Sequence, residues 1–329
     1  MSLKTFFPII CCLLYFTPGI AQKKQNVYFL KNSGAQVKLR DSADYIRVVS
    51  EPDSGATLYN VKDYYKSGKL MMIGKTSKVD PILLEEECMA YYPSGKKKQY
   101  SHYKQGHLVG DQYTYYPNGR LYVYTKFASD IANQGTGYNL NYHIMACNDS
   151  TGKELTVDGN GYYIGYNNDF KTVKEEGSLK AGIKDGKWKG NNGIEDNYIT
   201  YAEEYSNGKL VSGESVDRDN KVVTYTVSER EPQYKGGITA FYAYLGKNVI
   251  YPINARRNFI QGTVYISFVV EKDGSLTDVK VARSPNEELS AEALKTVKNS
   301  PNWEPGLQYG RAVRVQYTVP VKFTLGSPN

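Results

Sequence analysis

The stretch WEPGLQYGRAVRVQYTVPVKF, Trp303 to Phe323, decides how the C-terminal part of this chain folds. It opens with a turn signal, Glu304-Pro305-Gly306, and then alternates apolar and polar residues as far as Phe323. Alternation with a period of two predicts a β-strand with one face in a core and the other in water. Pro320 lies inside the run, and because proline cannot donate a ladder hydrogen bond, it indicates a strand at the edge of a sheet.

The residues before this strand predict a β-hairpin and helices. Gln261–Ser284 alternates on both sides of Asp273-Gly274, which is typical of a hairpin. A capping box with proline at the first helical position is compatible with a helix from Ser284-Pro285-Asn286-Glu287 to Asn299. Two shorter helices are predicted, one starting at Pro252 and an earlier one with an apolar stripe of Ile238, Phe241, Tyr242 and Leu245. Residues 229–329 therefore read as a small α+β domain.

The order of these residues resembles the C-terminal domain of the TonB family. The resemblance covers residues 231–325 and rests on a set of positions that occur in family order. These positions are Gly236, Gly237, Tyr251, Pro252, Gly262, Asp273, Gly274, Trp303, Pro305 and Gly306. The tryptophan and the Pro-Gly turn also have a plain structural reading, as a core plug and as the entry into the last strand.

The resemblance implies a mode of binding. TonB proteins take energy from an inner-membrane motor and pass force to outer-membrane transporters, whose N-terminal box joins the C-terminal domain as an added strand. Here the receiving edge is expected along Arg311, Ala312, Val313, Arg314, Val315, Gln316, Tyr317 and Thr318. The two arginines of this run would favour an acidic or carbonyl-rich partner segment, and an ordinary solvated strand face explains them equally well.

The N-terminal half repeats a short phrase. YYKSGKL at Tyr64, YYPSGKK at Tyr91, YYPNGRL at Tyr115 and EYSNGKL at Glu204 each predict strand, turn and strand. The phrases resemble MORN-type repeats, which implies antiparallel hairpins laid side by side. The chain holds 31 tyrosines against 10 phenylalanines, and rows of tyrosine on such a sheet serve either as cross-strand packing or as a platform for sugars and peptides.

The first residues are typical of an export signal. Lys4 precedes an apolar run from Phe6 to Phe16, and Gly19-Ile20-Ala21 forms a small-residue cleavage site before Gln22. This run is shorter than the roughly 20 residues that cross a bilayer as a helix. The chain is expected in the periplasm of a Gram-negative bacterium. If the segment is retained instead of cleaved, it would associate the chain with the inner membrane and its motor proteins.

The sequence carries no catalytic signature. Its three histidines have no metal-ligand spacing, and it has neither a nucleophile elbow nor a phosphate loop. The net charge of +7 is spread along the chain, which argues against nucleic-acid binding. We therefore expect no enzyme activity, no cofactor, no metal and no small-molecule substrate. Cys88 and Cys147 would remain after cleavage, either as a disulfide or as free thiols.

Two hypotheses about function remain. The first is a TonB-like envelope protein that supports energy-coupled transport by binding an outer-membrane transporter through strand addition. The alternative is a structural or interaction module of the periplasm that binds cell-wall polymer or another envelope protein. The expected organisation is a signal peptide (1–21), a strand-rich lead-in (22–54), hairpin repeats (55–228) and a TonB-like domain (229–329).

Overall fold

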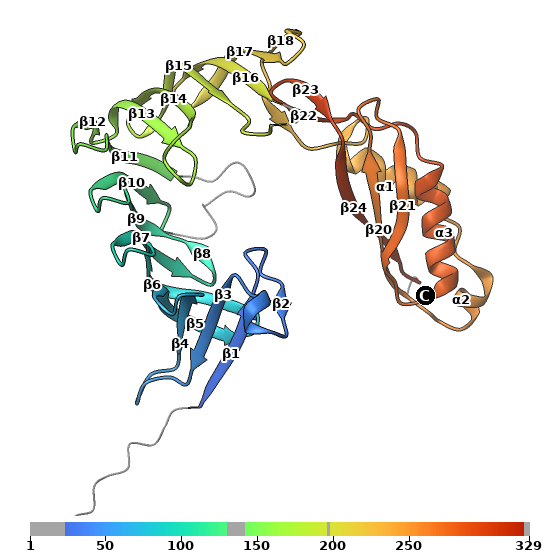
Figure 1. Ribbon diagram of the computed structural model, residues 1–329. Coiled ribbons are helices and arrows are strands. Elements are labelled where there is room, and N and C mark those ends of the chain that lie inside the picture. Colours follow the sequence, from blue (N-terminus) through green and yellow to red (C-terminus); the bar gives the residue numbers. More distant parts are fainter. Residues whose placement is uncertain (1–23, 130–141, 196–197, 326–329) are drawn as a thin grey trace, which may run out of the picture. The chain divides into compact units, whose positions relative to one another are not determined.

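The computed structural model describes residues 24–129, 142–195 and 198–325 (Figure 1). The chain divides into two compact units, one of Met1–Arg120 with Phe127–Asn141 and one of Leu121–Lys126 with Tyr142–Asn329. The predicted signal peptide lies outside the described residues, so its cleavage stays a prediction. The boundaries predicted for the later segments likewise stay predictions.

The first unit is built from antiparallel strands that pair mostly with their neighbours in sequence. From β3 to β7 every strand pairs with the next, β1 pairs with both β2 and β3, and β7 pairs with both β8 and β9. A short 3-10 helix, Arg40–Ser42, precedes β3. The strands are β1 (Gln25–Leu30), β2 (Gln36–Val37), β3 (Tyr45–Ser50), β4 (Tyr59–Tyr65), β5 (Leu70–Val79), β6 (Ile82–Tyr91), β7 (Lys97–Lys104), β8 (His107–Leu108) and β9 (Gly110–Tyr115).

The second unit continues with hairpins of the same kind. From β11 to β18 each strand pairs antiparallel with the next. Its repeat strands are β10 (Leu121–Phe127), β11 (Tyr142–Asn148), β12 (Glu154–Val157), β13 (Asn160–Tyr166), β14 (Val173–Lys180), β15 (Ile183–Asn191), β16 (Ile199–Ser206), β17 (Lys209–Asp217) and β18 (Val222–Tyr225). The predicted series of antiparallel hairpins is confirmed, whereas MORN-type identity stays a prediction.

Glycines in these strands make room for aromatic rings on the neighbouring strand. Trp188 lies directly opposite Gly177, and a Cβ on that glycine would come within 2.4 Å of the indole ring. Tyr225 lies opposite Gly213 with the same close approach, 2.3 Å from a built Cβ to the ring. The buried rings thus pack flat on bare backbone, which supports the packing reading of these aromatic residues.

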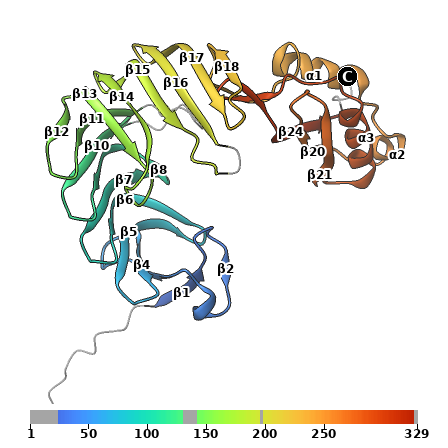
Figure 2. The same ribbon diagram turned by 45° about the horizontal axis from the view of Figure 1, so that its top comes forward.

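The C-terminal domain combines two small sheets with three helices (Figure 2). One sheet has the order β21-β20-β24 and the other has the order β19-β22-β23. Helix α3 contacts both β20 and β21. The elements are β19 (Glu229–Arg230), α1 (Gly237–Asn248), α2 (Ile253–Arg257), β20 (Gly262–Val270), β21 (Leu276–Arg283), α3 (Glu287–Lys298), β22 (Gly306–Gln308), β23 (Arg311–Val313) and β24 (Val315–Phe323).

Trp303 lies at the centre of the domain core. The centroid of its ring is 5.0 Å from the ring centroid of Phe241 in α1, 5.2 Å from that of Phe268 in β20 and 5.7 Å from that of Tyr317 in β24. The indole N–H is satisfied because it donates to Ser300 Oγ at 3.1 Å. The expectation that this tryptophan plugs the space between helix and sheet is confirmed.

Three local predictions need correction. Only half of the expected apolar stripe of α1 is buried: Phe241 is covered, while Ile238 and Tyr242 are each 48% exposed. The N-cap of α3 is Asn286, whose side chain accepts from two backbone amides, so Pro285 precedes the cap instead of opening the helix. The predicted last strand is also not continuous, because it breaks at Arg314 between β23 and β24.

Candidate functional site

The last strand lies at the edge of its sheet. β24 pairs along its whole length with β20, from Phe323 opposite Gly262 to Val315 opposite Val270. Among the described residues, no strand pairs with its other edge. The prediction of an edge strand is confirmed for β24, and unpaired backbone groups there offer a template for an added strand.

Pro320 shows which backbone groups face the open edge. It lies within an unbroken register with β20, opposite Tyr265. A proline fits there without losing a ladder bond only if its nitrogen points away from β20. Because N–H groups alternate in direction along a strand, those of Gln316, Thr318 and Lys322 point to the open edge as well. The N–H groups of the odd-numbered residues point toward β20 instead. Leu325 N, just after β24, accordingly donates to Gln261 Oε1 at 2.8 Å, next to the start of β20.

A groove runs beside this edge. It has a volume of about 590 Å³, and its walls come from α1, β20 and β24. Tyr242 and Gly246 contribute from α1 and Val249 from the residue that follows it, while Pro320 and Lys322 contribute from β24. The lining contains no acidic residue, and Lys322 is its only charged side chain. An extended peptide added to β24 would lie against this mostly apolar groove.

Arg314 is held by two acids of its own domain. Its Nε donates to Glu271 Oε1 at 2.8 Å and its Nη2 donates to Asp278 Oδ2 at 2.9 Å. The Glu271 bond is the main reason that the pKa of Arg314 is raised. The pKa of Glu271 is lowered, first by the hydroxyl of Thr277 and then by this guanidinium. Intramolecular pairing therefore accounts for Arg314, without an acidic partner.

Arg311, Ala312 and Val313 belong to the second small sheet. Their strand, β23, pairs with β22 in a hairpin that turns at Tyr309 and Gly310. The turn packs on the last repeat strands, where the ring of Tyr309 stacks on that of Tyr201 with centroids 4.8 Å apart. The predicted receiving edge from Arg311 to Thr318 is thus divided, and only Val315, Gln316, Tyr317 and Thr318 lie in β24.

The signature residues have structural roles. Gly236 and Gly237 adopt φ of 89° and 79° at the start of α1, and Pro252 caps α2. Gly274, next to Asp273 in the hairpin turn, has φ of 83° and lies so close to Trp303 that a Cβ would meet its carbonyl oxygen at 1.9 Å. Tyr251 donates its hydroxyl to Ile260 O at 2.6 Å. Three more occur where chain segments approach closely: Gly262 against Pro285, Gly306 against Val315, and Pro305, whose carbonyl accepts from Arg230.

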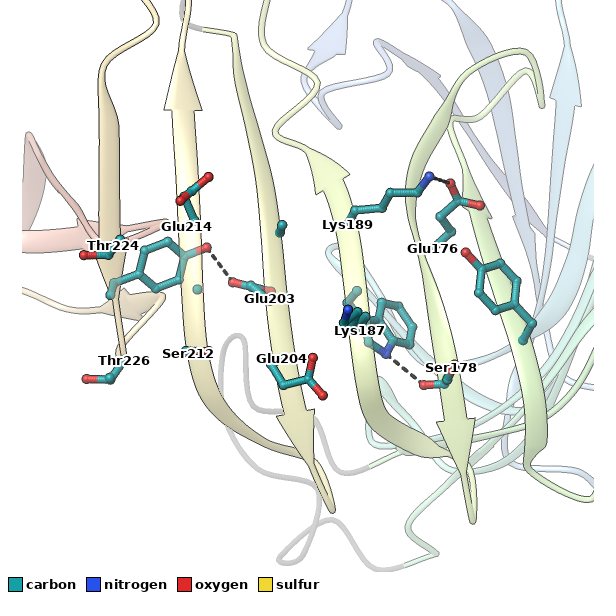
Figure 3. Close-up of a pocket in the computed structure, with 15 residues that line it drawn as sticks. Glu176, Ser178, Lys187, Lys189, Glu203, Glu204, Ser212, Glu214, Thr224 and Thr226 are labelled. Carbon is teal, nitrogen blue, oxygen red and sulfur yellow. Dashed lines mark hydrogen bonds and ion pairs between the residues drawn. The ribbon is translucent and has the colours of Figure 1, made fainter.

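A second open surface lies on the repeat strands β13 to β18 (Figure 3). It is a trough of about 980 Å³ that the sequence did not reveal, because short segments of several separate hairpins form it. Lysines and glutamates line it, and Lys189 pairs with Glu176 at 2.9 Å. In its lining, the buried residue Glu203 accepts hydrogen bonds from the hydroxyls of Tyr205 and Tyr225, both at 2.9 Å. Burial, and after it the Glu203 charge, raises the pKa of both tyrosines.

The described parts of the chain were compared with two further kinds of site, a metal centre and a membrane-spanning helix. No group of three or more His, Cys, Asp or Glu residues there is placed to hold a metal ion. None of the helices described is long and apolar enough to cross a bilayer.

Comparison with known families supports the reading of the C-terminal region. Residues 247–325 match the model of the family described as Gram-negative bacterial TonB protein C-terminal. This match confirms the resemblance for the C-terminal domain and leaves the repeats unassigned. A comparison with curated proteins finds no match for the chain.

Proposed function

We propose that this protein is a TonB-like protein of the Gram-negative cell envelope that binds a partner by strand addition to β24. The observation that carries the proposal is the open edge of β24, which lies in a domain that matches the TonB C-terminal model. In this proposal the protein is a binding protein and not an enzyme. It uses no cofactor, and it binds neither nucleic acid nor a small-molecule substrate.

The outward groups of β24 define what the partner must offer. The N–H groups of Gln316, Thr318 and Lys322 need carbonyl acceptors in an extended segment, and Pro320 supplies a carbonyl but no donor. Backbone hydrogen bonds would supply affinity, while alternate side chains of the segment would enter the groove beside α1. The N-terminal box of an outer-membrane transporter is the partner that the TonB resemblance suggests. Such binding would support energy-coupled transport, with motor proteins as further partners if the N-terminal segment is retained.

Amide hydrogen exchange tests this site directly. A peptide of a TonB-dependent transporter's N-terminal box should protect the amides of Gln316 and Thr318. The amides of Tyr317 and Val319, which face β20, should be protected with or without peptide. Binding that leaves Gln316 and Thr318 in fast exchange would show that the partner docks elsewhere.

One observation favours a second candidate function. The charged trough on β13–β18 is open and large, as expected of a module that binds wall polymer or another envelope protein. Binding to isolated peptidoglycan should then survive deletion of residues 231–329 and be lost on Lys187→Glu with Lys189→Glu. If the full chain with Lys187→Glu and Lys189→Glu binds peptidoglycan as the wild type does, the trough has no such role.

A further inference from the structure

Three large apolar side chains project into solvent at one end of the C-terminal domain. They are Ile250, which is 65% exposed, Ile253, which is 61% exposed, and Phe259, which is 79% exposed. We call these three residues, together with Arg256 and Arg257, the apolar tip. Single exposed apolar residues are common, but three within ten positions call for an explanation.

Phe259 has an unfavourable backbone conformation, for which its exposed side chain offers no compensation. Helix α2 ends in a pair of bonds, from Ile260 N to Ala255 O at 2.9 Å and from Phe259 N to Arg256 O at 3.3 Å. This is the Schellman arrangement, in which the position of Phe259 is left-handed and usually glycine. Phe259 adopts a φ of 54° there, a conformation that a residue with a Cβ adopts only at a cost. Since the ring packs into no core, the fold itself gains nothing that offsets this cost.

The tip is rigidly presented. Glu288 of α3 accepts from Ala255 N at 3.1 Å and from Asn254 Nδ2 at 3.2 Å. Glu292 of the same helix accepts from Ile250 N at 2.9 Å. The buried side of the segment is fixed by Ala255, which is 0% exposed. The exposed side chains of Ile250, Ile253 and Phe259 are therefore held outward by the fold.

The charge of the tip is basic. Arg256 and Arg257 lie three and four positions after Ile253, so all three share one side of the helical turn. Both arginines are exposed, and within the described residues neither forms an ion pair. Between Lys247 and Phe259 the chain has no acidic residue. The nearest acids, Glu288 and Glu292 of α3, bond to Asn254, Ala255 and the amide of Ile250 and not to the arginines. The tip thus combines projecting apolar groups with two exposed arginines that form no ion pair among the described residues.

We propose that the apolar tip is a membrane-contact site, at which Ile250, Ile253 and Phe259 enter the interface of an anionic bilayer and the two arginines meet lipid phosphates. Three side chains expose far less area than the ~800 Å² per partner that a stable protein interface buries. A lipid surface needs only a few inserted apolar groups backed by basic residues. The site shares no residue with the open edge of β24, so this inference does not depend on the strand-docking proposal.

The experiment places a fluorescent reporter at the tip of the full chain. Trp188 and Trp303 are buried, 2% and 4% exposed, so a Phe259→Trp substitution adds the only exposed indole within the described residues. With vesicles that mix phosphatidylcholine and phosphatidylglycerol in equal parts, its emission should shift to the blue and be quenched by brominated lipid. Leu39→Trp is the matched control, because Leu39 is 68% exposed and lies far from the tip in sequence.

Two further variants separate insertion from loss of folding. Arg256→Gln with Arg257→Gln, made in the Phe259→Trp background, should weaken binding to these vesicles about thirtyfold. Phe259→Gly should reduce sedimentation with these vesicles while the thermal midpoint stays the same or rises, since glycine suits the left-handed position. An indole at position 259 that remains in water beside anionic vesicles overturns the proposal. Self-association of the chain through the tip, with no response to vesicles, overturns it as well.

Discussion

Arg311 of β23 and Asp217 at the end of β17 form an ion pair between residues 94 positions apart, with Nη1 to Oδ2 at 2.6 Å. The same guanidinium donates from Nε to Ser215 Oγ at 2.9 Å and from Nη2 to the carbonyls of Ser215 and Lys221. The C-terminal domain is thereby fastened to the last repeat strands through Arg311, a residue of the predicted receiving edge that was expected to face either a partner segment or solvent.

Replacing Arg311 should loosen this attachment. Arg311→Met keeps much of the aliphatic stem but removes every one of these hydrogen bonds. We expect the free energy of unfolding to fall by about 1–3 kcal/mol, because Ser215 and Asp217 lose their donor. Urea denaturation measures the loss. Proteolysis should also become faster between β18 and β19, and an unchanged denaturation midpoint would contradict the assigned role.

Acid should weaken the same attachment. The backbone N–H of Lys221, and after it Arg311, lowers the pKa of Asp217 below its ordinary value of 3.8. A carboxyl with a lowered pKa stabilises the fold fully above its unfolded pKa and loses this effect as pH falls through the folded pKa. The wild type should therefore lose more stability than the Asp217→Asn variant when pH is lowered past 3.8. Equal acid sensitivity of the two proteins would argue against this carboxylate.

Two glycines of the C-terminal domain should respond in opposite ways to alanine. Gly274→Ala should destabilise by more than about 1 kcal/mol, because φ is 83° and the new Cβ would meet the carbonyl oxygen of Trp303. Gly246→Ala should stabilise by about 0.5–1 kcal/mol, because this helical position has nothing within 4 Å of an added Cβ. Thermal unfolding of the two variants checks both signs. A loss of stability at Gly246 would mean that the groove beside α1 needs a glycine there.

Local patterns explain what the sequence allowed us to predict. The hairpin of β20 and β21, the edge position of β24 and the end of α3 at Asn299 all depend on residues close together in sequence. Alternation, turn residues and caps carry that information directly. The central place of Trp303 also followed, since a large ring beside a turn has few alternatives to a core position.

Long-range contacts explain what the sequence left out. At the break in the last strand, Arg314 bonds to Glu271 in the turn after β20 and to Asp278 in β21. These acids lie 43 and 36 positions earlier in the chain, so the local pattern around Arg314 carries no signal of them. Ile238 is exposed because only part of the apolar face of α1 is covered. Periodicity alone does not determine how much of that face is covered. The left-handed Phe259 was missed because a helix end of this kind is normally recognised by its glycine.

The buried cysteines should be unreactive in the folded protein. Burial raises the pKa of the Cys88 thiol to about 11 and also raises that of Cys147, and both are free thiols. Because the thiolate is the reactive form, alkylation near pH 8 should be much slower in the native state than in urea. Mass spectrometry that maps the label to Cys88 and Cys147 gives the rates. Rapid native labelling of Cys88 near pH 8 would show that its strand opens readily.

A pair of proline substitutions tests the open edge of β24 most directly. The backbone nitrogens of Thr318 and Pro320 point to the same side of β24, away from β20. Thr318→Pro should therefore remove an outward N–H and leave the ladder to β20 intact. Val319→Pro instead removes a donor that faces β20 and should cost about 3 kcal/mol or more. We therefore expect Thr318→Pro to fold with nearly native circular dichroism yet lose binding of an extended partner peptide. If the two variants unfold alike, the assigned direction of the β24 amides is wrong, and if Thr318→Pro binds the peptide normally, the partner does not add to this edge.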